Sequence, residues 1–173
     1  MNKAVFLDRD GTINIDYGYV SDPKKFEFLP KAIEGLRKIS ELGYLLIIIS
    51  NQSGIGRGYY TIEDYEKVTK KMLDYLTLQN IKIAECFYCP HSPESNCICR
   101  KPGTKMVEDA IAKWKVDPKQ SYFIGDKESD IKAGSLSGLK TILISNTPKT
   151  FGQDFTATDL MNVADYILQS SEK

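Results

Sequence analysis

The sequence lacks features that would attach the protein to a membrane or to a polyanion. Its 173 residues include 23 Lys and Arg against 23 Asp and Glu, so the formal net charge is zero. Such a chain has no long-range field that draws it to nucleic acid or to an anionic bilayer. No run approaches the ~18 apolar residues of a membrane-spanning helix. The N-terminal sequence MNKAVFLDRDG has only four consecutive apolar residues before the charged Asp8, which is too few for the apolar core of a secretory signal. We therefore expect a cytoplasmic protein that binds neither nucleic acid nor membrane.

Cysteine and histidine are scarce, and all of them lie in one stretch. The four cysteines and the single histidine fall within residues 86–99, CFYCPHSPESNCIC. Clustered thiols in a reducing compartment are more often metal ligands than disulfide partners. The spacing of Cys89, His91, Cys97 and Cys99 predicts a tetrahedral Zn²⁺ site. Cys86 could complete a rival four-cysteine set, but it lies inside an apolar strand, so we assign it to core packing.

A closed site with four protein ligands has no free coordination position, so its zinc would be structural. The predicted zinc loop, residues 89–99, leads directly into Arg100 and Lys101. A metal-pinned loop would fix the direction in which these two cations point.

Short β-branched apolar runs predict buried strands, and amphipathic stretches between them predict helices. The strands are expected at 4–8, 44–50, 85–89, 122–126 and 141–145. The helices are expected around 33–42, 62–75, 104–114 and 128–137, while the tail after residue 146 is weakly patterned. Alternating strands and helices indicate an α/β, Rossmann-like parallel sheet with helices on both faces. The length suits a single domain over residues 1–173, without a separate cap domain.

Polar residues follow each of the first four predicted strands, where ligands of such folds bind. Asp8 and Asp10 end the first strand, Ser50 the second, and Asp126 the fourth, while Lys101 follows the third. Converging carboxylates suit Mg²⁺, and a carboxylate can also attack phosphorus. Asp10 is placed to donate and accept a proton, and Ser50 and Lys101 can hold phosphoryl oxygens.

Each of these features has a simpler explanation when it is taken alone. A D-x-D sequence after a strand is usually a solvated turn, Ser50 could cap a helix, and Lys101 could be a solvated cation. Their joint appearance at successive strand ends favours a catalytic site.

The joint pattern resembles the haloacid dehalogenase superfamily of phosphatases. The resemblance lies in DRDGT (8–12), SNQSG (50–54), RKPG (100–103) and GDKESD (125–130). It implies that Asp8 is the nucleophile, that Asp10 is the acid and base, and that Ser50 and Lys101 steady the phosphoryl group. It further implies that Asp126 completes a Mg²⁺ site with Asp8 and the backbone carbonyl of Asp10, and that Asp130 supports the loop or a metal-bound water.

Within the superfamily, two features of this chain are similar to the heptose bisphosphate and histidinol phosphate phosphatases. One is the zinc loop, and the other is a length that leaves no room for a separate cap domain. DYGYV (16–20), NQSGIGRG (51–58) and FYCPHSP (87–93) are more similar to the heptose enzymes. The short zinc loop departs from that pattern and keeps the histidinol enzymes as the alternative. The glycine directly after Pro102 is a second departure, because heptose enzymes often carry an extra residue and a second proline there, and it bears on the local backbone and on Lys105. The resemblance implies a sugar phosphate substrate, with these substrate-binding residues: Asp16, Tyr17, Gly18, Tyr19, Asn51, Gln52, Ser53, Arg100 and Lys127. Tyr17 and Tyr19 have packing as their alternative role.

Two other classes of protein share parts of this pattern. A signalling receiver module also carries an aspartate that is phosphorylated at a strand end, although the built-in acid and base of D-x-D favour rapid release of phosphate. A zinc-based interaction module with a degenerate active site would not need both aspartates, Ser50, Lys101 and Asp126. Nothing in the composition requires a dimer, so we expect a monomer.

Overall fold

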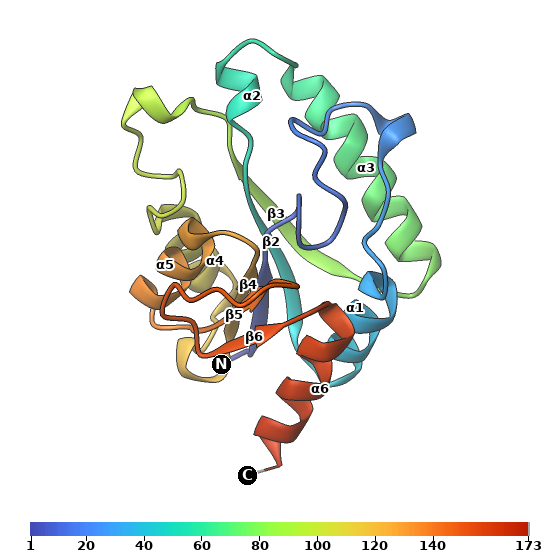
Figure 1. The fold of residues 1–173 in the computed structure, drawn as a ribbon, viewed down its shortest axis with the longest axis vertical. Helices are drawn as coiled ribbons and strands as arrows, with labels where there is room; N and C mark the ends of the chain where they lie inside the picture. The colour runs from blue at the N-terminus through green and yellow to red at the C-terminus, as the bar shows by residue number, and fades with distance from the viewer. Residues whose placement is uncertain (173) are drawn as a thin grey trace.

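The structure is a computed structural model that describes residues 1–172. Within this range, six parallel strands form one sheet in the order β3-β2-β1-β4-β5-β6 (Figure 1). The strands are β1 (Ala4–Leu7), β2 (Leu45–Asn51), β3 (Ile83–Cys89), β4 (Tyr122–Gly125), β5 (Lys140–Ile144) and β6 (Phe155–Ala157).

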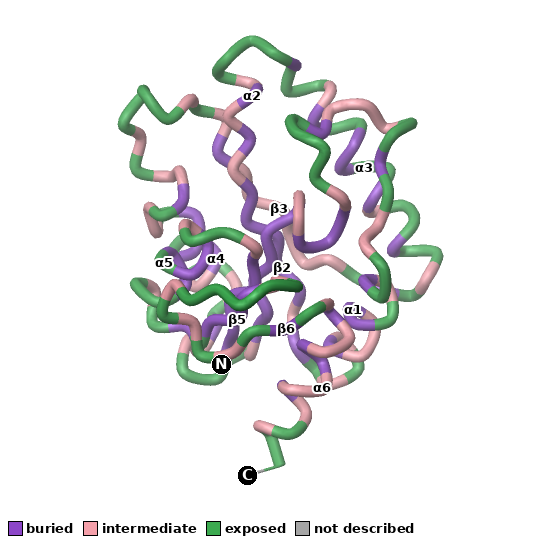
Figure 2. The backbone as a smooth tube through the Cα atoms, in the orientation of Figure 1, coloured by how far each residue is buried: buried purple, intermediate pink, exposed green. Residues whose placement is uncertain are grey.

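Helices cover both faces of the sheet because side chains alternate along each strand. In β1, Val5 and Leu7 face one core and Phe6 faces the other. The first core is covered by α1 (Ala32–Glu41), α3 (Ile62–Leu78) and α6 (Leu160–Ser171). The second is covered by α4 (Lys105–Trp114) and α5 (Glu128–Leu136). A short helix, α2 (Ser53–Gly56), follows β2. Figure 2 shows that burial is concentrated in the central strands.

The predicted α/β class with a parallel sheet and helices on both faces is confirmed, as are the five predicted strands. The sequence reading missed β6 and α6. β6 has only three residues, and its central Thr156 is exposed. The signal for α6 was present, because Leu160, Val163 and Ile167 recur at helical spacing behind an Asp159 N-cap.

The strand order places the expected site at one edge of the sheet. β1 pairs with β2 on one side and with β4 on the other, so the direction of strand addition reverses between β1 and β4. In open parallel sheets, ligands bind outside the carboxyl ends of the strands at such a switch point. Asp8 follows β1 and Asp126 follows β4, so both lie there. No helix in the described part of the chain is long and apolar enough to cross a membrane.

Candidate active site

Three carboxylates gather at the switch point. The backbone N–H of Asp8 donates to the carbonyl of Ile124 at 3.0 Å, which ties the end of β1 to β4. Oxygen atoms of Asp8, Asp126 and Asp130 lie within 4.8 Å of one another. Gly11, in the turn after β1, has no space for a side chain beside these carboxylates. Its φ is +91°, and a Cβ built on it would lie 2.3 Å from Asp126 Oδ2.

The surroundings of Asp8 and Asp126 disfavour their negative charge. Burial, reinforced by Asp130 and opposed by Lys101, raises the pKa of Asp8 to about 6. Burial, reinforced by Asp8, raises the pKa of Asp126 to about 7. Asp126 Oδ1 is buried without a hydrogen-bond partner. Paired carboxylates with an unused oxygen fit a hard divalent cation such as Mg²⁺.

Lys101 lies beside Asp8, the predicted nucleophile. Its buried ammonium donates to Asp8 Oδ1 at 2.8 Å and to the carbonyl of Ile49 at 2.7 Å, and it lies 2.7 Å from Asp130 Oδ1. Burial alone would lower the pKa of Lys101, but Asp130 and Asp8 outweigh it and raise that pKa. The side chain of Asn51 accepts from the Lys101 N–H at 2.9 Å and donates to its carbonyl at 3.1 Å. Asn51 therefore fixes the backbone that carries this cation.

Asp130 braces the loop that carries Asp126. Its Oδ2 accepts the backbone N–H groups of Asp126 at 3.2 Å and of Lys127 at 3.1 Å. Its other oxygen is the one that pairs with Lys101. The oxygens of Asp130 are thus engaged by protein donors, and the side chain orients both Asp126 and Lys101.

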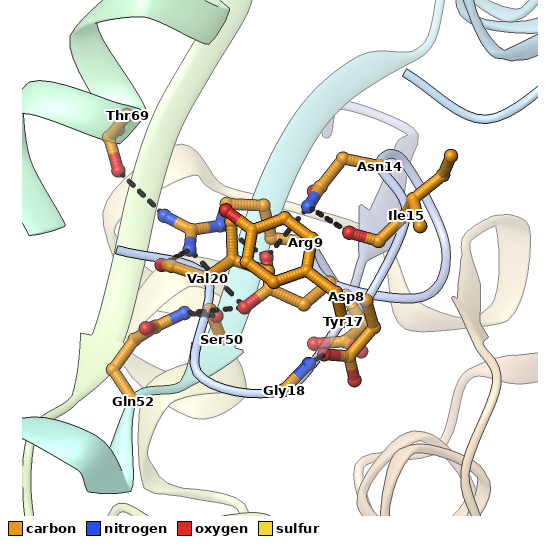
Figure 3. A network of polar contacts seen from close by, with 12 residues as sticks. Asp8, Arg9, Asn14, Ile15, Tyr17, Gly18, Val20, Ser50, Gln52 and Thr69 are labelled. Carbon is orange, nitrogen blue, oxygen red and sulfur yellow. Dashed lines mark hydrogen bonds and ion pairs between the residues drawn. The ribbon is translucent and has the colours of Figure 1, made fainter. Parts of the chain in front are cut away.

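The carboxylate of Asp10 is held by four N–H groups. Arg9 donates through Nε to Oδ1 at 2.8 Å and through Nη2 to Oδ2 at 3.2 Å. Asn14 donates to Oδ1 at 3.0 Å and Gln52 to Oδ2 at 3.3 Å. Figure 3 shows Arg9 at the centre of this network. The sequence reading did not single out Arg9, because a charged residue between two aspartates is normally solvent-exposed.

Ser50 and Gln52 form a second chain of hydrogen bonds. Tyr60 donates to Gln52 Oε1 at 2.5 Å, and Gln52 Nε2 donates to Ser50 Oγ at 2.7 Å. Burial raises the pKa of Tyr60 to about 12, so its hydroxyl keeps its proton and remains a donor. Tyr60 was also missed, since nothing in GRGYY separates it from its exposed neighbour Tyr59.

A cavity of about 250 Å³ opens over Asp8, Asp10 and Lys101. Its wall also contains most of the predicted substrate-binding residues, namely Asp16, Gly18, Tyr19, Asn51, Gln52, Ser53, Arg100 and Lys127. Tyr17 is absent from that wall; it is 43 % exposed, and its hydroxyl donates to the carbonyl of Asp22 at 3.5 Å.

The predicted zinc ligands come together at the end of β3. One ligand atom from each of Cys89, His91, Cys97 and Cys99 lies within 4.8 Å of the others. His91 Nδ1 is 3.4 Å from Cys89 Sγ and 3.2 Å from Cys99 Sγ. Ligand atoms of tetrahedral Zn²⁺ are separated by roughly 3.5–3.8 Å. Cys89 Sγ lies 3.5 Å from Cys97 Sγ and 3.0 Å from Cys99 Sγ, so these pairs of atoms are at that spacing or closer together, and a donor set of three sulfurs and one imidazole nitrogen is compatible with zinc. Cys86 is not in the group and packs against the core on the opposite face of the sheet.

The parallel sheet, the aspartate pair at its switch point and the buried lysine beside the first aspartate match the phosphatases of the haloacid dehalogenase superfamily, to which the solved structures similar to this chain belong. The model of the polynucleotide kinase 3 phosphatase family matches residues 3–168. The chain belongs to this family, and it is a phosphoric monoester hydrolase.

Similar proteins of known name cover nearly the whole chain. The D-glycero-β-D-manno-heptose-1,7-bisphosphate 7-phosphatase of Haemophilus influenzae is 40% identical, over 98% of this chain and 93% of its own length. The enzyme of the same name from Helicobacter pylori strain 26695 is 43% identical, over 96% and 98%. The crystal structure of D,D-heptose 1,7-bisphosphate phosphatase from B. bronchiseptica, complexed with magnesium and phosphate, superposes with a TM-score of 0.88 at 27% identity, covering 97% of this chain and 99% of that one.

Proposed function

We propose that this protein hydrolyses the 7-phosphate of D-glycero-D-manno-heptose 1,7-bisphosphate to heptose 1-phosphate and inorganic phosphate. The names of the similar proteins support this substrate. The structural observation that carries the proposal is Arg100, which lines the cavity above Asp8 and has a buried Nη1 without a partner. A substrate with a second phosphate would satisfy that donor through a charge-assisted hydrogen bond.

We assign the two chemical steps to Asp8 and Asp10. A carboxylate oxygen of Asp8 attacks phosphorus, and the bond from phosphorus to the sugar oxygen breaks. Protonated Asp10 gives its proton to that oxygen. Water then attacks the aspartyl phosphate while Asp10 takes its proton, so the phosphorus–Asp8 bond breaks and both aspartates are regenerated.

The remaining groups stabilise the phosphoryl group in flight. Lys101 and Ser50 supply donors to its oxygens. Asp8, Asp126 and the Asp10 backbone carbonyl are the proposed Mg²⁺ ligands. When bound, the cation would neutralise charge on the phosphoryl oxygens.

Selection of the sugar falls to loops at the rim of the cavity. We assign contacts with the sugar to Asp16, Gly18, Tyr19, Gln52 and Ser53, and contacts with the second phosphate to Arg100 and Lys127. Lys127 lies 3.6 Å from Asp16, so binding of a phosphate would compete with this ion pair. Zn²⁺ held by Cys89, His91, Cys97 and Cys99 would fix the segment that carries Arg100. The rapid phosphate release that this mechanism provides distinguishes the protein from a receiver module.

The substrate assignment is tested by comparing kcat/KM for heptose 1,7-bisphosphate, as both anomers, with kcat/KM for histidinol phosphate. We expect a preference for the bisphosphate of at least about tenfold, because only this substrate uses Arg100. Asp8→Asn, which removes the nucleophile, should reduce turnover of both by about 10³-fold or more. A preference for histidinol phosphate would overturn the heptose assignment and leave the phosphatase class intact.

A further inference from the structure

Arg9 lies inside the catalytic motif and is completely buried, with 0 % of its surface exposed. Its guanidinium makes two hydrogen bonds to Asp10, one to Thr69 Oγ1 on α3 at 3.1 Å and one to the carbonyl of Val20 at 3.3 Å (Figure 3). It also lies over the ring of Tyr65, 5.2 Å from its centre. A buried guanidinium is strongly unfavourable unless a carboxylate pairs with it. Asp10 provides this partner, and no other carboxylate in residues 1–172 pairs with Arg9.

We propose that Arg9 is a positioning residue that fixes the orientation of the Asp10 carboxylate for proton transfer. This inference rests on the proposed function, because it concerns the step in which Asp10 protonates the leaving oxygen. Arg9 itself does not line the cavity over Asp8 and Asp10. It acts through Asp10.

The geometry explains why an arginine is needed. The terminal torsion of an aspartate side chain is broad, so one contact leaves the two oxygens free to rotate. The guanidinium contacts both oxygens at once, at 2.8 and 3.2 Å, and a two-pronged contact fixes the plane of the carboxylate. A general acid must hold its proton within hydrogen-bond reach of the leaving oxygen, and small misplacements slow such steps severely.

The donors around Asp10 also indicate which oxygen exchanges contacts during turnover. Oδ1 accepts from Arg9 and Asn14 at 2.8 and 3.0 Å, whereas Oδ2 accepts the longer bonds from Arg9 and Gln52 at 3.2 and 3.3 Å. Four donors occupy all the acceptor sites of an ionised carboxylate. A proton on Asp10 must therefore displace a donor, and the Gln52 bond at Oδ2 is the longest of the four. Arg9 and Asn14 anchor Oδ1 while Oδ2 carries the proton.

The competing explanation is that Arg9 only ties the catalytic loop to α3 and to the chain near Val20. A purely structural tie would affect all substrates equally. A positioning role affects substrates according to how much they need an acid. Alkyl phosphates, including sugar phosphates, expel a strongly basic alkoxide, whereas p-nitrophenyl phosphate expels a phenolate that leaves without a proton.

The test compares kcat/KM for heptose 1,7-bisphosphate and p-nitrophenyl phosphate in Arg9→Met, a neutral replacement of similar length. The ratio kcat/KM covers only the steps up to phosphoryl transfer, so the later attack of water does not enter it. We expect a loss of about 10²-fold for the sugar phosphate and of less than about tenfold for the aryl phosphate. Asp10→Asn should show the same selectivity, and the double variant should lose no more than Asp10→Asn alone.

Two further variants separate positioning from folding. Thr69→Val removes the hydrogen-bond partner of Arg9 on α3 and leaves both bonds from Arg9 to Asp10. It should therefore lower the melting temperature without changing the ratio of kcat/KM between the sugar phosphate and the aryl phosphate. Arg9→Lys keeps the buried positive charge but loses the planar guanidinium that contacts both oxygens of Asp10. It should fold even where Arg9→Met does not, and it should shift the ratio in the same direction by a smaller factor. Equal losses for both substrates in the Arg9 variants, with a selective loss in Asp10→Asn, would overturn the proposal.

Failure of the heptose assignment would be distinguishable from failure of this inference. If the wild-type enzyme does not hydrolyse heptose bisphosphate, the same comparison is made with the alkyl phosphate that it hydrolyses best. The role of Arg9 depends on the leaving group and not on the identity of the sugar.

Discussion

At the scale of single residues, the site keeps Asp126 in surroundings that disfavour its charge. Burial and the neighbouring Asp8 raise its pKa from 3.8 to about 7. The folded state therefore holds a proton that the unfolded state has already lost, and the free energy of unfolding falls as the pH rises from about 4 to about 7. The penalty is complete above about pH 7 and absent below about pH 4. Binding of Mg²⁺ would remove it.

Asp126→Asn cannot ionise, so without divalent cations it should be more stable than the wild type at pH 8. We expect a gain of about 1–3 kcal/mol that disappears near pH 4. Mg²⁺ should raise the melting temperature of the wild type and leave that of Asp126→Asn unchanged. Thermal unfolding of both proteins across this pH range, with EDTA or with Mg²⁺, measures these effects. A variant that is less stable than the wild type at pH 8 in EDTA would contradict the electrostatic argument.

Sequence reasoning identifies residues whose role follows from their place at a strand end. Asp8 and Asp126 were predicted to meet because both follow buried strands of a parallel sheet, and they do lie together. Arg9 and Tyr60 could not be found in this way, because their burial depends on α3 and on the loops that fold over them. Their hydrogen bonds join segments that are distant in the sequence, and no local pattern encodes such contacts.

At the scale of elements, the segment between β3 and α4 has little core of its own. Its start is tied to α2, because the N–H of Gln52 donates to the carbonyl of Cys89 and that of Gly56 to the carbonyl of Pro90, both at 2.8 Å. The sulfur atoms of Cys97 and Cys99 lie near the second core. We therefore expect the proposed zinc ion to order the rest of this segment.

Cys97→Ser and Cys86→Ser form a matched pair that tests the zinc site. The wild type and Cys86→Ser should bind about one Zn²⁺ per chain, because Cys86 packs on the far face of the sheet. Cys97→Ser should bind less and should lose about tenfold or more in kcat/KM for the bisphosphate, because Arg100 is no longer held in place. Elemental analysis and kinetics measure the two effects. Zinc loss in Cys86→Ser as well as in Cys97→Ser would support the four-cysteine alternative, and full zinc retention in Cys97→Ser would contradict both ligand sets.

The elements that sequence reasoning located well are those with long apolar patterns, such as β2 and α3. Ile62 and Tyr75, the first and last residues of the predicted helix 62–75, are 41 and 45 % exposed, whereas the buried stripe of α3 runs through Tyr65, Val68, Met72 and Leu76. β6 was missed for a physical reason: a three-residue edge strand has too few alternating positions to show a period.

At the scale of the whole molecule, α1 near the start of the chain packs closely against α6 near its end. A Cβ built on Gly35 of α1 would lie 2.3 Å from the backbone carbon of Leu160. This contact joins the N-terminal and C-terminal thirds of the sequence on one face of the sheet (Figure 1).

Gly35→Ala should destabilise the protein by about 1–3 kcal/mol, although alanine favours helix over glycine by about 1 kcal/mol. Glu34→Ala, at the exposed neighbouring position, should change stability by less than about 0.5 kcal/mol. Denaturant unfolding followed by far-UV circular dichroism and by the fluorescence of Trp114, on the opposite face, should give coincident transitions if residues 1–173 form one domain. Separate transitions would show that the chain contains more than one cooperative unit.

The close approach of Gly11 to Asp126 has a consequence for how such chains diverge. With only 2.3 Å between a hypothetical methyl group and the carboxylate oxygen, residue 11 cannot gain a side chain while Asp126 keeps its place. The two positions are therefore expected to change together in evolution. Gly11 can be replaced by a larger residue only after Asp126 has been substituted. A descendant that carries alanine at position 11 should already have lost its cation and its turnover.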